Sequence, residues 1–78
     1  MMNLSRTFTQ EVNGRTINFH VTYDLQTHFF NVVEDDQVSY TLQFNPEAKA
    51  WTTSGGSEPS IPVSQLAQLV QQSFGVFV

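Results

Sequence analysis

Apolar and polar residues alternate strictly over residues 16–25. The intervening polar residues are Thr, Asn, His or Asp, and the apolar or aromatic ones are Ile17, Phe19, Val21, Tyr23 and Leu25. Such alternation is typical of a strand that buries one face. We therefore predict a strand over residues 15–25 as the element around which the fold is organised.

Another strand is predicted over residues 4–12, directly before Asn13 and Gly14. This dipeptide favours a two-residue type I′ hairpin turn, because both residues tolerate positive φ. Such a turn sets Phe8 opposite Phe19. In this register the apolar residues of both strands share one face, so the turn and the hydrophobic pattern agree: Leu4, Phe8, Val12, Ile17, Phe19, Val21 and Tyr23.

The stretch at residues 28–34 does not alternate, and two registers compete for it. We favour the register in which Gln26 and Thr27 form a two-residue turn, because it sets Val21 opposite Val32 and Tyr23 opposite Phe30 on the core face. Two apolar residues are then left on the opposite face, Phe29 and Val33. They predict a second, smaller apolar patch there.

Three further elements complete the predicted sheet. A three-residue loop at 35–37 leads into a strand over residues 38–44, and a turn around Pro46 leads into a short strand over residues 49–53. The only tryptophan, Trp51, lies in this last strand, and we expect it in the core because small domains usually bury their largest side chain. Residues 54–60 are rich in Gly and Ser and predict a flexible link that no strand or helix crosses.

A helix is predicted over residues 62–74, with Pro62 in its first turn and Gly75 as its C-terminal stop. Leu66, Leu69, Val70 and Phe74 are spaced to form one apolar stripe. The helix carries no charge, so packing against the sheet must stabilise it. The sequence thus predicts one α+β domain over residues 1–78, an antiparallel meander of four to five strands with one C-terminal helix packed on one face.

Composition narrows the range of functions. The chain has 78 residues, no cysteine, seven Phe and a net charge of −4, so its core must stabilise it without disulfides. Sparse negative charge disfavours binding to nucleic acid or to anionic lipid. We find neither a signal peptide nor a run of apolar residues long enough to span a membrane, and the expected location is the cytoplasm.

The polar residues do not form a recognisable catalytic or metal site. His20 and Asp24 share the outer face of a strand, but positions four apart in a strand are separated by about 13 Å, too far to share a metal. Glu34, Asp35 and Asp36 cluster where Asp favours turns, without the glycine and the later Glu of a helix-loop-helix calcium site.

Two small motifs are likewise uninformative. The Gly55 and Gly56 pair lacks the Lys-Ser/Thr of a phosphate loop, and Ser60 and Ser64 have no identifiable partner base. The sequence therefore predicts no catalytic residue, no cofactor-binding residue and no metal ligand.

The sequence resembles small uncharacterised one-domain bacterial proteins in which an antiparallel meander precedes a C-terminal helix. The residues that carry the resemblance are Phe8, Gly14, Ile17, Phe19, Val21, Phe44, Asn45, Pro46, Trp51, Pro62 and residues 66–70. The resemblance implies a fold and no activity. The same order of elements is similar to single repeats of PUR-alpha-type single-stranded nucleic-acid binders, whose sheet faces are basic and aromatic, whereas the outer face of residues 16–24 is neutral to acidic here.

We therefore expect a small soluble protein-interaction module without catalytic activity, with a PUR-like nucleic-acid-binding module as the alternative and a small enzyme or enzyme subunit as the third hypothesis. Sheet edges can pair with another chain, so a protein partner or self-association as a homodimer is expected. The residues predicted to form the interaction surface are apolar and lie outside the predicted core: Phe29, Val33, Val76, Phe77 and Val78.

Overall fold

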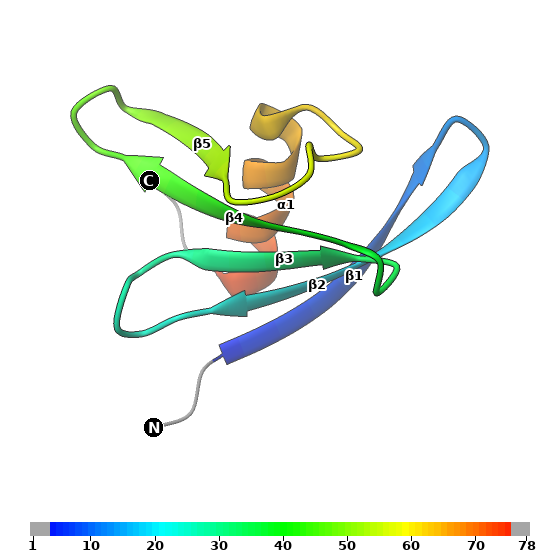
Figure 1. Cartoon of the computed structure of the whole chain (residues 1–78), viewed down its shortest axis with the longest axis horizontal. Coiled ribbons are helices and arrows are strands. Elements are labelled where there is room, and N and C mark those ends of the chain that lie inside the picture. Colours follow the sequence, from blue (N-terminus) through cyan, green and yellow to red (C-terminus); the bar gives the residue numbers. More distant parts are fainter. Residues whose placement is uncertain (1–3, 76–78) are drawn as a thin grey trace.

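The computed structural model describes residues 4–75 and contains one five-stranded antiparallel sheet followed by one helix. The strands follow one another in sequence order across the sheet, and α1 crosses behind β3 and β4 in the view of Figure 1, so that one face of the sheet is covered. The predicted α+β meander with a C-terminal helix is thereby confirmed. The elements are β1 (Leu4–Val12), β2 (Arg15–Tyr23), β3 (Phe30–Glu34), β4 (Val38–Asn45), β5 (Ala50–Ser54) and α1 (Val63–Phe74).

The β1–β2 hairpin has the predicted turn and register. Asn13 and Gly14 have φ values of 51° and 81°, as a type I′ turn requires. Phe8 pairs with Phe19, and their rings stack with centroids 5.1 Å apart. Because β3 pairs only with residues 19–23 of β2, the tip of this hairpin projects beyond the rest of the sheet (Figure 1).

The register between β2 and β3 is also as predicted, with Tyr23 opposite Phe30, but the two-residue turn at Gln26 and Thr27 is wrong. Residues 24–29 form a longer connection, so β2 ends two residues earlier than predicted and β3 begins two residues later. The cause is Asp24, whose carboxylate accepts the Gln26 N–H at 2.8 Å and whose carbonyl accepts the His28 N–H at 2.8 Å. These local bonds replace the ladder that would have extended both strands.

The loop at residues 35–37 is confirmed, with Val32 opposite Tyr40, whereas the following turn lies one residue later than predicted. It spans residues 46–49, and β5 begins at Ala50 because Lys49 has a φ of 52°, which is incompatible with a strand. Trp51 pairs with Phe44 on the core face, as predicted, and its side chain is half-buried.

The helix begins one residue after Pro62, whose carbonyl accepts the Leu66 N–H at 2.9 Å, and ends at Gly75 with a φ of 71°. The buried helix residues are Leu66, Ala67 and Val70, whereas Leu69 is only half-buried. The apolar stripe is thus rotated toward Ala67 relative to the prediction, because this small side chain allows the helix to approach the sheet closely.

The core lies between α1 and the inner face of the sheet. All five strands and the helix pack against it, and its buried members are Ile17, Phe19, Val21, Phe30, Val32, Tyr40, Leu42, Ile61, Leu66 and Val70. The helix in the described range is too short and too polar to cross a lipid bilayer.

Candidate functional site

The residues considered for catalysis or metal binding are dispersed. Within residues 4–75, no three His, Cys, Asp or Glu side chains lie close enough together to hold a metal ion. His20 is exposed on the outer face of β2, and Asp24 is engaged in the turn that follows.

The acidic loop of residues 34–36 has a structural role, as its sequence indicated. The Asp35 carboxylate accepts the Asn18 backbone N–H at 2.9 Å and lies 3.7 Å from the exposed Arg15 guanidinium. Asp35 and Asp36 both have positive φ, a conformation that Asp tolerates better than most residues. The loop therefore closes the β3–β4 hairpin and ties it to β2.

Glu34 is the exception in this cluster, because its side chain is buried with 3% exposure. One carboxylate oxygen accepts the Tyr40 hydroxyl at 2.5 Å and the Ser60 N–H at 3.1 Å, and the other accepts the Ser60 hydroxyl at 2.5 Å. Three donors thus satisfy a buried carboxylate that has no cationic partner among the described residues. The sequence indicated only a turn for this cluster and identified no partner for Ser60, so neither the burial of Glu34 nor its bonds to Ser60 were predicted.

The Glu34 contacts attach the link between β5 and α1 to the sheet. A second attachment lies nearby, where the Ser57 N–H donates to the Ser39 carbonyl at 3.4 Å. At Gly56 an added Cβ would lie 2.1 Å from the Ser39 carbonyl oxygen, so only glycine permits this approach. β5 runs one residue into the predicted link, to Ser54, and residues 55–60 contain no strand or helix but are held against the sheet at both points.

Tyr40 supplies a testable consequence of this cluster. Its burial, followed by its hydrogen bond to Glu34 and the Glu34 charge, raises the pKa of Tyr40 well above its usual range. Because the unfolded chain releases this proton near pH 10 and the folded chain retains it, the free energy of unfolding is unaffected below about pH 10 and falls as the pH rises above it. Chemical denaturation between pH 7 and 11 is expected to show this loss for the native chain and for Tyr23→Phe, and a flatter profile for Tyr40→Phe. Equal profiles for all three chains would contradict the assignment.

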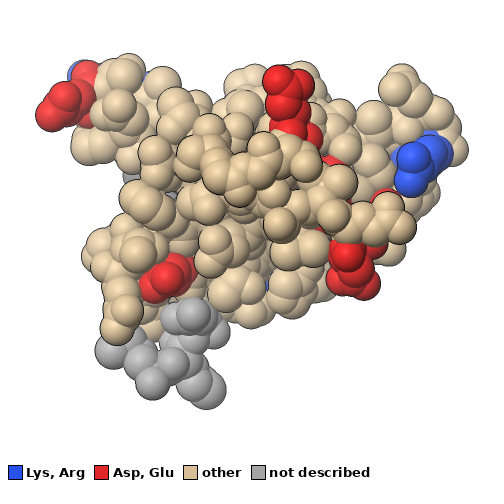
Figure 2. All heavy atoms as spheres, viewed as in Figure 1, with Lys and Arg blue, Asp and Glu red and all other residues tan. Residues whose placement is uncertain are grey.

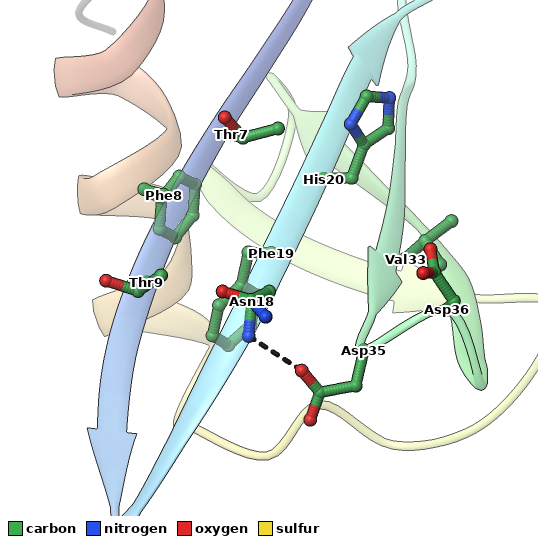
Figure 3. A pocket seen from close by; sticks show the side chains of 9 residues that line it. All are labelled: Thr7, Phe8, Thr9, Asn18, Phe19, His20, Val33, Asp35 and Asp36. Atoms are coloured by element: carbon green, nitrogen blue, oxygen red, sulfur yellow. Dashed lines mark hydrogen bonds between the residues drawn. The ribbon is translucent and has the colours of Figure 1, made fainter.

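The outer, helix-free face of the sheet contains a shallow hollow of about 580 Å³. Figure 3 shows Thr7 and Thr9 of β1, His20 of β2 and Val33 of β3 around it, with the bond from Asn18 to Asp35 at its lower rim. Asp35, which lines the hollow, lies 3.7 Å from the Arg15 guanidinium, and this contact closes a turn.

The rest of the outer face is also uncharged for the most part. The side chains that alternate away from the core on β1 to β4 are mainly Ser, Thr, Asn and Gln, with Glu11 as the only acidic group and no Lys, Arg or aromatic residue. Figure 2 shows the same pattern, because charged groups on that view are isolated from one another and uncharged surface dominates. Single-stranded nucleic-acid binders need stacking aromatic residues in a basic groove, and this face provides neither.

The open edge of β1 is the most extensive unpaired backbone in residues 4–75, since β1 has β2 as its only neighbour in the sheet. All nine β1 residues pair in one uninterrupted register, without a bulge or a proline. The Asn18 N–H and carbonyl are directed to Asp35, away from β1, so Asn18 and its partner Thr9 form a pair without mutual hydrogen bonds. By alternation, the β1 backbone groups directed to the open edge belong to Ser5, Thr7, Thr9 and Glu11.

Part of this edge is protected. Arg6 donates to the Ser5 carbonyl at 2.7 Å, and its guanidinium carbon lies 5.4 Å from the centre of the Phe74 ring. The Arg6 side chain thus covers the edge near Ser5.

An apolar groove of about 290 Å³ lies on the core side of the sheet, beside the C-terminal turn of α1. Its floor is Phe30, whose ring lies 4.9 Å from that of Tyr23, 5.9 Å from that of Trp51 and 5.3 Å from that of Phe74. His28 and Gln71 are its polar members, and His28 Nδ1 lies 2.6 Å from the Tyr23 hydroxyl. We call this the aromatic groove and define it by its apolar lining residues, Leu4, Tyr23, Phe30, Phe44, Trp51 and Phe74.

Of the predicted interaction residues, Phe29 and Val33 lie within the described range. Phe29 is 40% exposed in the loop before β3, and Val33 is half-buried on the outer face, where it lines the hollow without Phe29. Val76, Phe77 and Val78 lie outside the described residues.

No protein-family model, no curated protein and no solved structure matches this chain.

Sequence reasoning missed Glu34 and the aromatic groove, although part of the signal was present. The correct register already placed Glu34 on the same face as Val32 and Phe30, two and four residues earlier respectively. The strand pairing also placed Tyr23 beside Phe30. The positions of Phe74 and His28 over these rings depend on the packing of the helix and the path of a loop, which no pattern along the chain reports.

Proposed function

We propose that this chain is a small, non-catalytic protein-interaction module that pairs with an extended segment of a partner protein along β1. The observation that supports the proposal is the open edge at residues 7–11, where Thr7, Thr9 and Glu11 direct backbone donors and acceptors away from the sheet. An extended peptide that adds to such an edge gains a ladder of main-chain hydrogen bonds. Natural sheets usually protect edges of this length with proline, bulges or several charges, and β1 has only Arg6 and Glu11 as charges.

The nature of the edge indicates the kind of partner. Side chains on the two faces of β1 differ, since Phe8 and Val12 are half-buried beside the core while Thr7 and Thr9 face the solvent. A strand added beside β1 would continue both faces of the sheet, with apolar residues beside Phe8 and polar residues beside the threonines. The matching partner is therefore an amphipathic segment with alternating apolar and polar residues, and β1 of a second copy has this pattern itself.

Replacement of Thr9 by proline tests the proposal. Proline removes the Thr9 N–H, which is directed to the open edge, and leaves the hydrogen bonds between β1 and β2 intact. We expect Thr9→Pro to keep a cooperative thermal melt and to lose strand pairing, whereas the matched control Thr9→Val, which keeps the N–H, retains it.

Two measurements report the pairing. Sedimentation equilibrium over a concentration series measures self-association of the native chain and of the two Thr9 variants. Amide hydrogen exchange in the presence of proteins captured from lysate measures protection of the backbone amides of Thr7, Thr9 and Glu11. Protection of these three amides in the native chain and in Thr9→Val supports the proposal. Association that Thr9→Pro leaves unchanged, or protection confined to other strands, would overturn it. If Thr9→Pro fails to fold, Thr9→Lys tests the same edge through charge instead.

A further inference from the structure

The aromatic groove needs a separate explanation, because it lies on the core side of the sheet and is not lined by residues 7–11 of the open β1 edge. Its lining is apolar apart from His28 and Gln71, and Leu4 on its rim is 46% exposed. The rings of Tyr23, Trp51 and Phe74 each contact Phe30 in edge or tilted arrangements, so Phe30 holds the walls in place without an occupant. A preformed apolar hollow of this size accommodates a side chain rather than a large ligand.

The course of the chain at the end of α1 indicates the occupant. Phe74, the last residue of the helix, is itself a wall of the groove, and Gly75 then turns the chain through its positive φ while its N–H donates to the Gln71 carbonyl. The next three residues in the sequence are Val76, Phe77 and Val78, all apolar. Three extended residues reach roughly 10 Å, about the width of two neighbouring strands.

A segment of the same chain has an advantage over a separate molecule. Because it is attached one residue from the groove wall, its local concentration is on the order of millimolar or higher, which a second copy reaches only in concentrated solution. The groove also has no charged side chain that would select a polar or acidic partner.

We propose that the aromatic groove binds residues 76–78 of its own chain, with the Phe77 ring packed against the exposed sides of Phe30 and Trp51. The segment then completes the core beyond the last turn of α1, and residues 76–78 belong to the folded unit rather than to the strand-pairing surface of β1.

Trp51 provides a direct readout, because it is the only tryptophan and it lines the groove. Phe77→Ala and a chain that ends at Gly75 are expected to show a red shift of tryptophan emission and stronger quenching by acrylamide. The peptide acetyl-Gly-Val-Phe-Val, added to the shortened chain, is expected to reverse both changes in a saturable manner, and the same peptide with Ala in place of Phe is not. Phe29→Ala is the matched control, since it removes an exposed phenylalanine that does not line the groove.

Three results would overturn the proposal. Tryptophan emission that does not respond to Phe77→Ala or to the shortened chain would show that residues 76–78 do not bind there. Tryptophan emission of the native chain that changes with protein concentration would assign the groove to a second copy. An equal response in Phe29→Ala would show that the emission reports general loosening of the fold. If the shortened chain fails to fold, a comparison of Phe77→Ala with the conservative variant Phe77→Leu still decides the question. Leu is expected to retain most of the protection of Trp51 from acrylamide, and Ala is not.

Discussion

A chain cut after Gly56 is expected to be unfolded. The cut removes Ile61, Leu66 and Val70, which are buried against the sheet, and it exposes the inner faces of Phe19, Val32 and Leu42 to water. Each of these buried side chains contributes roughly 1.5–3 kcal/mol relative to exposure, and a chain of this size has a net stability of only about 4–12 kcal/mol. Loss of amide dispersion in NMR spectra and loss of a cooperative melt are the expected results. A dispersed spectrum for residues 1–56 would show that the sheet is stable without the helix.

Single substitutions in α1 test the packing of the helix against the sheet one side chain at a time. Leu66 is fully buried, so Leu66→Ala is expected to lower the free energy of unfolding by about 2–5 kcal/mol. Leu69 is half-buried, and its replacement by Ala is expected to cost less than that of Leu66. Gln68→Ala, at an exposed helix position, is the matched control with an expected change within about 0.5 kcal/mol in urea denaturation. A cost for Leu69→Ala that equals or exceeds that of Leu66→Ala would contradict the observed rotation of the stripe.

Replacement of Glu34 is also expected to destabilise the fold strongly, although the sequence indicated only a turn at this acidic cluster. Glu34→Ala leaves the buried Tyr40 hydroxyl without its acceptor and releases Ser60, so the free energy of unfolding is expected to fall by about 2–4 kcal/mol. Glu34→Gln keeps the size of the side chain and one accepting oxygen, and an intermediate loss is expected. Urea denaturation at neutral pH measures both.

The control for Glu34 is its neighbour Asp36, which is exposed and has positive φ. Asp36→Asn removes the charge and keeps a residue that tolerates this conformation, so its expected change is within about 0.5 kcal/mol. If Glu34→Ala and Asp36→Asn have equal effects, the loss is caused by removal of negative charge and the three hydrogen bonds at Glu34 contribute nothing.

The order and pairing of the strands could be derived from the sequence, because two independent signals agree. The Asn13 and Gly14 turn sets the register of β1 against β2, and the alternation of apolar residues requires the same register. The Phe30 and Val32 positions extend this agreement to β3, and the short loop at residues 35–37 extends it to β4. Each of these signals is local, since it depends on residues within a few positions of one another.

Local hydrogen bonds of polar residues determine where the strands end, which the hydrophobic pattern did not. The pattern predicted a strand as far as residue 25, yet the Asp24 carboxylate and carbonyl close a wider loop over residues 24–29. The competition between this loop and a continued ladder depends on hydrogen-bond geometry, which alternation does not report.

The sequence by itself determined the elements of this protein, their order and the buried face of the first two strands, whereas for residues 28–34 it left two registers in competition. Only the tertiary structure decided that Glu34 accepts bonds from Tyr40 and Ser60, the latter 26 residues away, and that Phe74 of the helix meets Phe30 of β3. The physical reason is that a strand or a turn is specified by neighbouring residues, whereas a buried hydrogen-bond cluster or an aromatic groove depends on how separate elements pack. The aromatic groove is of the second kind, whereas the open edge of β1 follows from the order of the strands.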